Sequence, residues 1–335
     1  MKNPLSYTSI NVAEIGSFSV GGHVRAVTGQ PEKRISVARN GPDRLVNLNG
    51  DYVTGQCYVH FTQLDTPQFT PPVTFWHGGA MTGVTWETTP DGRPGWQMYF
   101  LRQGYDVYIC DAMERGRSGW SPYPEIYTES PIFRTLDEAW GLFRMGAREG
   151  YSSSIDKREP YDGLQFPVQS FDQLGAQFVP RWTCHGTQSL DAYAEALRKI
   201  GPTLLVSHSQ GANLALEAVQ KYPELILGVV LIEPAAAPEH TLEGLKQASA
   251  VPHLFMWGDF IDQDPLWQQY RKMSDEYVEA LRGSGCLVDV IDLPKLGILG
   301  NSHVPMMDLN SDLIAEMVCD WFGSNKSLFN LSSAV

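Results

Sequence analysis

The sequence predicts an α/β fold with a mostly parallel, doubly wound sheet and one inserted segment. Short apolar runs rich in β-branched residues alternate with longer amphipathic runs along most of the 335 residues, and this order is typical of β–α–β units. A hydrophobic content of 43% provides for a large core. Because no internal repeat or low-complexity linker divides the chain, we expect one domain.

The alternation can be followed element by element. In the first third of the chain, strands are predicted at 15–20, 57–62, 73–76 and 106–110, and a helix at 96–103. In the second half, helices are predicted at 189–200, 212–221, 266–282 and 309–322, and strands at 203–207, 227–232, 253–257 and 287–292. This succession is the one expected of a doubly wound sheet.

Residues 119–183 break the alternation. The segment is rich in Pro, Tyr and Trp and contains one expected helix, at 135–148, with Thr135 as its N-cap. We predict that it forms a lid inserted above the sheet, so that residues 1–118 and 184–335 make up the α/β core. Its aromatic side chains indicate either a bulky apolar substrate group or simple packing, and they include Trp140, Phe143 and Phe166.

The chain is acidic, with a formal net charge of −13 and no run of Lys or Arg longer than a pair. Such a surface repels phosphate-rich partners, so nucleic acid is not expected to bind. No apolar stretch approaches the roughly 18 residues that a membrane span needs. The expected partner is a small-molecule substrate, and a homodimer is left open.

Five cysteines stand at wide spacings without a C-x-x-C pair, which fits reduced thiols better than a zinc site or a disulfide framework. The first six residues contain no apolar run, so we expect no signal peptide and a cytoplasmic location, or a secreted or periplasmic one if a leader was removed. No metal or organic cofactor is expected, because the chain has neither H-E-x-x-H nor a dinucleotide fingerprint.

A candidate nucleophile, Ser209, lies where an apolar strand turns tightly into a helix, in the run T-L-L-V-S-H-S-Q-G at 203–211. Such a turn holds the serine Oγ clear of the backbone, and the helix amino terminus offers N–H groups to a developing oxyanion. The usual pattern is G-x-S-x-G, and here Ser207 occupies the first small position. The replacement is mild because serine is also small.

A serine hydroxyl needs a base, and His303 is the best-placed histidine. It lies in the loop G-N-S-H-V-P, after the last predicted strand and before the final helix. The order serine, acid, histidine along the chain is the one that hydrolases with a serine at a strand–helix turn use. His208 is adjacent to Ser209 and should point away from it, and His77 belongs to a turn. An ordinary imidazole predicts activity that rises with pH through about 6–7.

The run His77-Gly78-Gly79-Ala80 directly follows an apolar strand. Glycines there allow backbone N–H groups to turn toward a substrate carbonyl. We expect an oxyanion hole made by the backbone amides of Gly79 and Gln210, with Ala80 as the alternative to Gly79.

Together with the segment D-x-x-x-R-G-R-S-G at 111–119, these motifs resemble the α/β-hydrolase fold superfamily. The run T-W-E-T-T-P-D-G-R at 85–93 and the S-H-S-Q-G turn resemble a narrower group of bacterial serine esterases. The resemblance extends from about residue 15 to 322. It implies an α/β-hydrolase fold and a triad acid that is a glutamate after the strand following the nucleophile helix.

Two carboxylates compete for the role of triad acid. Glu233 ends an apolar strand, where burial of its charge would be offset by an imidazolium partner. Asp262 follows the next strand, where most of the superfamily places its acid. The narrower resemblance and the apolar setting favour Glu233, and Asp262 remains the alternative. Asp111 fits less well because it belongs to the D-x-x-x-R-G turn.

These residues predict a serine hydrolase that cleaves carboxylic esters through an acyl-enzyme, with a Ser-His-Glu triad. The alternative is a C–C bond hydrolase, or a tailoring enzyme that processes a lactone or thioester with the same triad. A non-catalytic receptor on the same fold is disfavoured because every catalytic position is occupied. By the resemblance, dehalogenase and epoxide-hydrolase chemistry would need Asp in place of Ser209.

Overall fold

The computed structural model describes residues 9–329 and 332–333. Its centre is a twisted sheet whose spatial order is β1-β4-β6-β5-β7-β8-β9-β10, with β11 paired to β5. In the spatial order from β6 to β10 each strand is parallel to the next, whereas β1 pairs with β4, and β4 with β6, in the antiparallel sense. The predicted mostly parallel sheet is therefore confirmed. The strand bounds are β1 Val12–Val27, β4 Gly50–Leu64, β5 Phe69–Trp76, β6 Tyr105–Asp111, β7 Thr203–His208, β8 Ile226–Ile232, β9 His253–Trp257, β10 Val288–Asp292 and β11 Ser332–Ser333.

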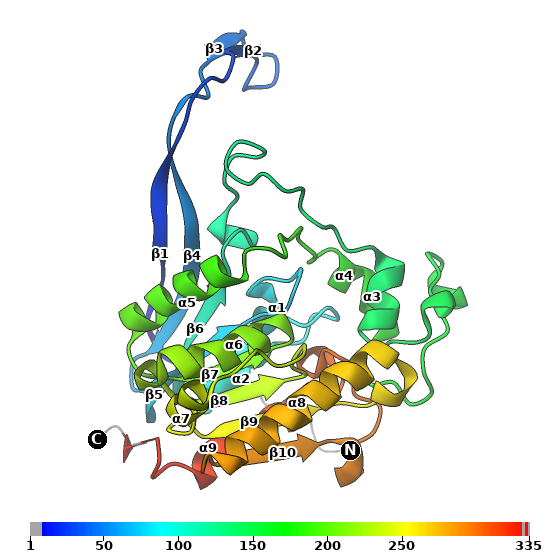
Figure 1. Cartoon of the computed structure of the whole chain (residues 1–335). Helices are drawn as coiled ribbons and strands as arrows, with labels where there is room; N and C mark the ends of the chain where they lie inside the picture. The colour runs from blue at the N-terminus through cyan, green and yellow to red at the C-terminus, as the bar shows by residue number, and fades with distance from the viewer. Residues whose placement is uncertain (1–8, 330–331, 334–335) are drawn as a thin grey trace.

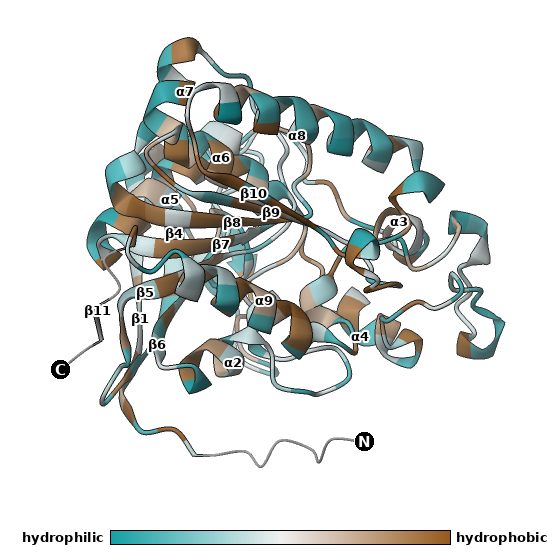
Figure 2. Cartoon of the chain, turned by 90° about the horizontal axis from the view of Figure 1, so that it is seen from below, coloured by the Kyte–Doolittle hydropathy of each residue, from teal (hydrophilic) through white to brown (hydrophobic). Residues whose placement is uncertain are grey.

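Helices cover both faces of the sheet (Figure 2). One face packs against α2 and α9, and the other against α5, α6, α7 and α8, each with its own apolar cluster. The apolar strands lie between these two layers, as a doubly wound sheet requires. The helix bounds are α1 Val84–Glu87, α2 Trp96–Arg102, α5 Gly186–Ile200, α6 Gln210–Lys221, α7 Leu242–Ala248, α8 Pro265–Gly283 and α9 Ser311–Ser324. Within the described residues, no helix is long and apolar enough to span a bilayer.

The strands β1 and β4 are much longer than the sequence predicts and project from the body as a two-stranded arm (Figure 1). Their antiparallel pairing extends from Val12 opposite Leu64 to Val27 opposite Gly50, with one register shift between Val12 and Glu14. Two short strands, β2 (Lys33–Ile35) and β3 (Arg44–Val46), pair at the tip of the arm. Apart from the buried Val27 and Thr54, the outer part of the arm is largely exposed, so its sequence lacks the alternation that marks a half-buried strand.

The segment 119–183 contains two helices, α3 (Leu136–Leu142) and α4 (Phe171–Gly175), and three short 3₁₀ turns at 148–150, 155–157 and 168–170. The Thr135 side chain caps α3 by accepting the N–H of Glu138 at 3.4 Å. The helix ends earlier than predicted because Arg144 adopts a left-handed backbone, with φ 55°. The role of this segment as a lid stays a prediction.

Candidate active site

Ser209 lies in the sharp turn between β7 and α6, with φ 55° and ψ −117°. Such a backbone is strained for a residue with a side chain, and this kind of strain concentrates at functional sites. Close packing around the turn explains its small neighbours: a Cβ on Gly211 would collide with the His77 carbonyl. Ser207 is accommodated because its hydroxyl donates to the Val230 carbonyl at 3.0 Å. The structure thus presents the Ser209 hydroxyl at the carboxyl end of the sheet.

His303 lies beside this hydroxyl, with 3.0 Å between its Nε2 and Ser209 Oγ. Its backbone N–H donates to the Phe143 carbonyl at 3.0 Å, and its ring centroid is 4.1 Å from that of Trp267. The side chain is 1% exposed. These contacts fix the imidazole in the position that a general base for Ser209 needs.

Glu233 lies on the opposite side of the imidazole, with 3.3 Å between its Oε2 and His303 Nδ1. It follows β8 in a left-handed backbone conformation, φ 52°, and is fully buried. Its other oxygen accepts the N–H of Gly258. By contrast, Asp262 is exposed in the 3₁₀ turn 261–263, and within the described residues its carboxylate makes no hydrogen bond to His303. The structure brings Ser209, His303 and Glu233 together and leaves Asp262 apart.

Arg144 is a member of this cluster that the sequence did not indicate. Its Nη2 lies 2.7 Å from Glu233 Oε1, its Nε donates to the Asp259 carbonyl at 2.7 Å, and its side chain is fully buried. Its guanidinium also lies over the Trp267 ring, 4.9 Å from the centroid. The sequence predicts a helix through residue 148, and that prediction gives no indication that Arg144 is buried. The left-handed turn that ends α3 directs it inward.

The electrostatics of the cluster favour a neutral imidazole. Burial lowers the pKa of His303 well below its ordinary 6.5, and the positive charges of Arg144 and Arg134 lower it further. A pKa of about 6–7, expected from an ordinary histidine, is therefore not what the structure gives. Since only the neutral ring can accept a proton from serine, His303 is ready to act as a base across the neutral range.

The backbone N–H groups of Gly79, Ala80 and Gln210 have no hydrogen-bond partner among the described residues. Gln210 is the first residue of α6, so its N–H points out of the helix end. His77 holds the glycine turn in place: its Nε2 accepts the Ala112 N–H at 3.0 Å, and its Nδ1 donates to the Gly78 carbonyl at 2.8 Å. Burial lowers the pKa of His77 to about 4, so the ring stays neutral. The free amides are available to a substrate oxygen.

The loop that carries His303 is organised by the buried carboxylate of Asp308. This carboxylate accepts hydrogen bonds from the Ser302 hydroxyl and N–H, both at 2.8 Å, and from the Asn301 side-chain amide at 2.9 Å. His208 supports the same loop: its Nε2 lies 2.8 Å from the His303 carbonyl, and it turns away from Ser209 as expected. Asp111 likewise has a structural role, since it accepts the N–H groups of Gly83 and Arg117.

A cavity of about 410 Å³ opens above Ser209. Phe143 contributes to its wall, whereas Trp140 and Phe166 are buried in the apolar core and do not reach it. Trp140 and Phe166 are therefore core residues, and their size gives no information about the substrate. The lining side chains are mixed in chemistry and include Arg134, Glu138, Leu142, Arg148, Arg181, Leu266, Trp267 and Tyr270.

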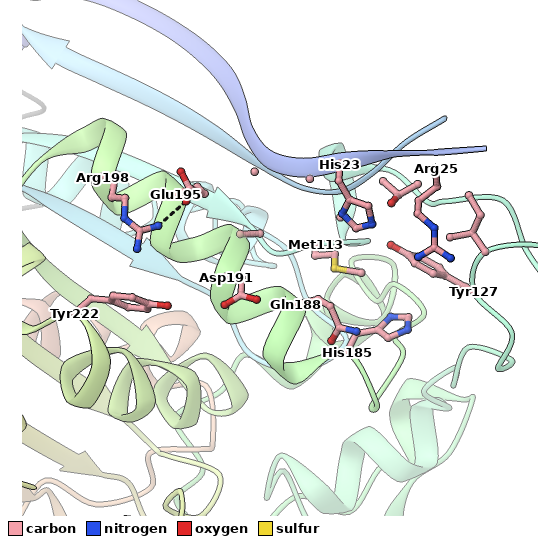
Figure 3. A pocket seen from close by; sticks show the side chains of 16 residues that line it. His23, Arg25, Met113, Tyr127, His185, Gln188, Asp191, Glu195, Arg198 and Tyr222 are labelled. Carbon is pink, nitrogen blue, oxygen red and sulfur yellow. Dashed lines mark hydrogen bonds and ion pairs between the residues drawn. The ribbon is translucent and has the colours of Figure 1, made fainter. Parts of the chain in front are cut away.

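A second cavity, of about 570 Å³, lies between the base of the arm and α5 (Figure 3). His23 and Arg25 from β1 approach it from one side, and Asp191 and Glu195 from α5 lie on the other. His185, at its edge, is paired with Glu114 at 2.7 Å. Because Ser209 and His303 do not line it, this cavity is separate from the candidate site.

Comparison with known proteins shows the family of this chain. Residues 71–288 match the alpha/beta hydrolase fold family, and the chain belongs to that family. A solved structure described as a novel bacterial esterase is 30% identical, with a TM-score of 0.79 over 95% of this chain and 98% of that one. A probable secreted lipase, phiG, of a fungal species (strain ATCC 74256) is 25% identical over 82% of this chain and 87% of its own length. The protein is thus an α/β-family hydrolase with esterase-like and lipase-like relatives.

Proposed function

We propose that the protein is a carboxylic ester hydrolase that acts through an acyl-enzyme on Ser209. The observation that carries this proposal is the 3.0 Å approach of His303 Nε2 to Ser209 Oγ, in a chain whose relatives include a bacterial esterase. A histidine at this distance can remove the serine proton as the hydroxyl attacks.

In the proposed reaction, Ser209 Oγ attacks the ester carbonyl while His303 Nε2 accepts its proton. The Gly79 and Gln210 amides stabilise the oxyanion, with Ala80 as the alternative to Gly79. Glu233 orients the ring through Nδ1 and stabilises the imidazolium. When the tetrahedral intermediate collapses, the imidazolium protonates the departing alcohol. Water then attacks the acyl-enzyme with the same base, which releases the acid and restores Ser209.

The test is hydrolysis of a series of 4-nitrophenyl esters of increasing acyl length, with Ser209→Ala as the blank. The native chain should release 4-nitrophenol at a rate that saturates with substrate concentration and depends on acyl length. A native chain that is no faster than Ser209→Ala on every ester would contradict the proposal.

Two further features belong to the same proposal. We infer that the segment 119–183 covers the site as a lid, because Phe143 and Arg144 within it contact His303 and Glu233.

A cytoplasmic location is supported by five free cysteines, of which Cys57 and Cys110 are buried neighbours. Since one relative is a probable secreted lipase, fractionation of the producing cells decides between the two compartments.

A further inference from the structure

The cavity above Ser209 contains more positive charge than its carboxylates balance. Three arginines line it, in a chain whose net charge is −13. Arg134 pairs with Glu138 at 3.0 Å, and Arg148 pairs with Asp137 at 2.7 Å. Arg181 has no carboxylate within ion-pair distance among the residues that the structure describes.

The remaining carboxylate on the cavity wall does not serve Arg181. Asp264 is the N-cap of α8, where its Oδ1 accepts the backbone N–H of Leu266 at 2.8 Å and that of Trp267 at 3.3 Å. Its charge is therefore directed at the amino terminus of the helix. One guanidinium of the cavity is left without a counter-charge from the protein.

Arg181 is held next to the oxyanion turn. Its backbone makes two hydrogen bonds with Ile132, at 2.8 and 3.0 Å, and the N–H of Val179 donates to the Ala80 carbonyl at 3.0 Å. Its guanidinium lies so close to Gly79 that a Cβ at that position would collide with Nη1. The unpaired charge thus lies beside the amide to which we assign the oxyanion, on a backbone fixed to the same turn.

Arg134 adds to the positive field at this point. Its side chain is 4% exposed, and its Nε is buried without a hydrogen-bond partner. Burial lowers its pKa, and the nearby charge of Arg181 lowers it further. Arg134 and Arg181 lie in one cavity, where only Arg134 has a carboxylate partner. Their positive charges repel each other, and a bound anion would offset that repulsion.

We propose that the substrate is an ester that carries a second, ionised carboxyl group, bound by Arg181 with support from Arg134. This inference rests on the proposed function, since it concerns the substrate of the same Ser209 site. A planar guanidinium matches a carboxylate through two parallel hydrogen bonds, which a neutral ester group cannot accept as strongly. The carboxylate lies close to the scissile carbonyl because Arg181 contacts the oxyanion turn.

The experiment compares two matched pairs of esters. On the acyl side, 4-nitrophenyl hydrogen glutarate is compared with neutral 4-nitrophenyl pentanoate. On the alcohol side, 4-acetoxybenzoate is compared with its methyl ester. The readout is the ratio of kcat/KM for the charged ester to that for the neutral ester, after subtraction of the rate with Ser209→Ala, which removes hydrolysis by the ester's own carboxylate.

The native chain should favour the charged member of at least one pair by about 10- to 100-fold, the range expected for one charge-assisted pair. Arg181→Gln should bring that ratio close to one, and Arg181→Lys should restore part of it. The matched control Arg282→Gln removes the same charge from the end of α8 and should keep the native ratio. The lack of a native preference for the charged ester in either pair, or an unchanged ratio in Arg181→Gln, would overturn the subsite. Failure to hydrolyse any of the four esters would instead overturn the esterase proposal itself.

Discussion

Arg144 and Glu233 form an ion pair of 2.7 Å in which neither side chain is exposed to solvent. The pair joins the turn after α3 to the end of β8, two segments 89 residues apart in the chain. A carboxylate is costly to bury without a partner, and the Arg144 guanidinium offsets that cost at Glu233 Oε1 while Glu233 Oε2 faces His303. The same positive charge lowers the pKa of His303. The ion pair therefore affects both the orientation and the basicity of the imidazole.

Removal of the Arg144 charge should move the pH dependence of the reaction. In Arg144→Gln, loss of a positive charge near the imidazole raises the pKa of His303, so the acid limb of kcat/KM on a neutral ester shifts to higher pH. A purely structural role would lower activity without that shift. Arg282→Gln, which removes an exposed arginine paired with Glu279 far from the cavity, is the control and should leave the limb in place.

The native enzyme should remain active well below neutral pH. Because burial and then the charges of Arg144 and Arg134 lower the pKa of His303 below 6.5, the ring stays neutral and able to accept a proton from pH 8 down past about 6.5. We expect kcat/KM to be flat over that interval and to fall only on the acid side. A profile that loses half its activity at or above pH 6.5 would contradict the assignment. The pKa of Asp308 lies in the same pH range, so the profile is also measured on Asp308→Asn. An unchanged profile in that variant shows that Asp308 does not produce the acid limb.

Glu233 rather than Asp262 should control turnover. Glu233→Gln removes the charge that stabilises the imidazolium, and kcat should fall by up to about 10⁴-fold with little change in KM. Because this change also leaves Arg144 buried without its partner, thermal unfolding must first show that the variant is folded. Asp262→Asn alters an exposed side chain and should stay within about tenfold of the native rate. The reverse order of effects would transfer the role to Asp262.

The contribution of Asp308 to the free energy of unfolding should decrease as pH rises. Burial raises the pKa of this carboxyl from 3.8 to about 7, so between these values the folded state holds a proton that the unfolded state releases. The contribution is complete below pH 3.8 and is lost as pH rises through 7. Asp308→Asn lacks this dependence, so its free energy of unfolding relative to the native chain should increase from pH 5 to pH 8. Urea unfolding at both values measures it, and exposed Asp162→Asn should show no such trend.

The sequence predicted the parts of the site that local patterns encode. Ser209 is marked by a strand, a tight turn and a helix within nine residues, and Glu233 by a carboxylate at the end of an apolar strand. Arg144 and Arg181 could not be found in this way, because their roles depend on contacts with segments far away in the chain. At Arg144, moreover, a left-handed turn interrupts a pattern that otherwise continues as helix.

The same distinction holds for the fold. The buried strands β7 and β8 were predicted to within a residue or two at their ends, since burial on both faces leaves a continuous apolar run. The outer arm of β1 and β4 was underestimated because its exposed residues carry no such run. Helix α7 was not predicted, and Gly244 within its seven residues lowers its helix propensity.

Covalent labelling tests the central claim most directly. The folded protein is treated with a 4-nitrophenyl alkylphosphonate, and the modified residue is located by peptide mass spectrometry while residual activity is followed on 4-nitrophenyl acetate. We predict a single phosphonyl group on Ser209 and loss of activity in proportion to labelling. Ser209→Ala should not be labelled, and His303→Ala should be labelled more slowly than the native chain. Inactivation through another residue, or ester hydrolysis retained by Ser209→Ala, would contradict the account.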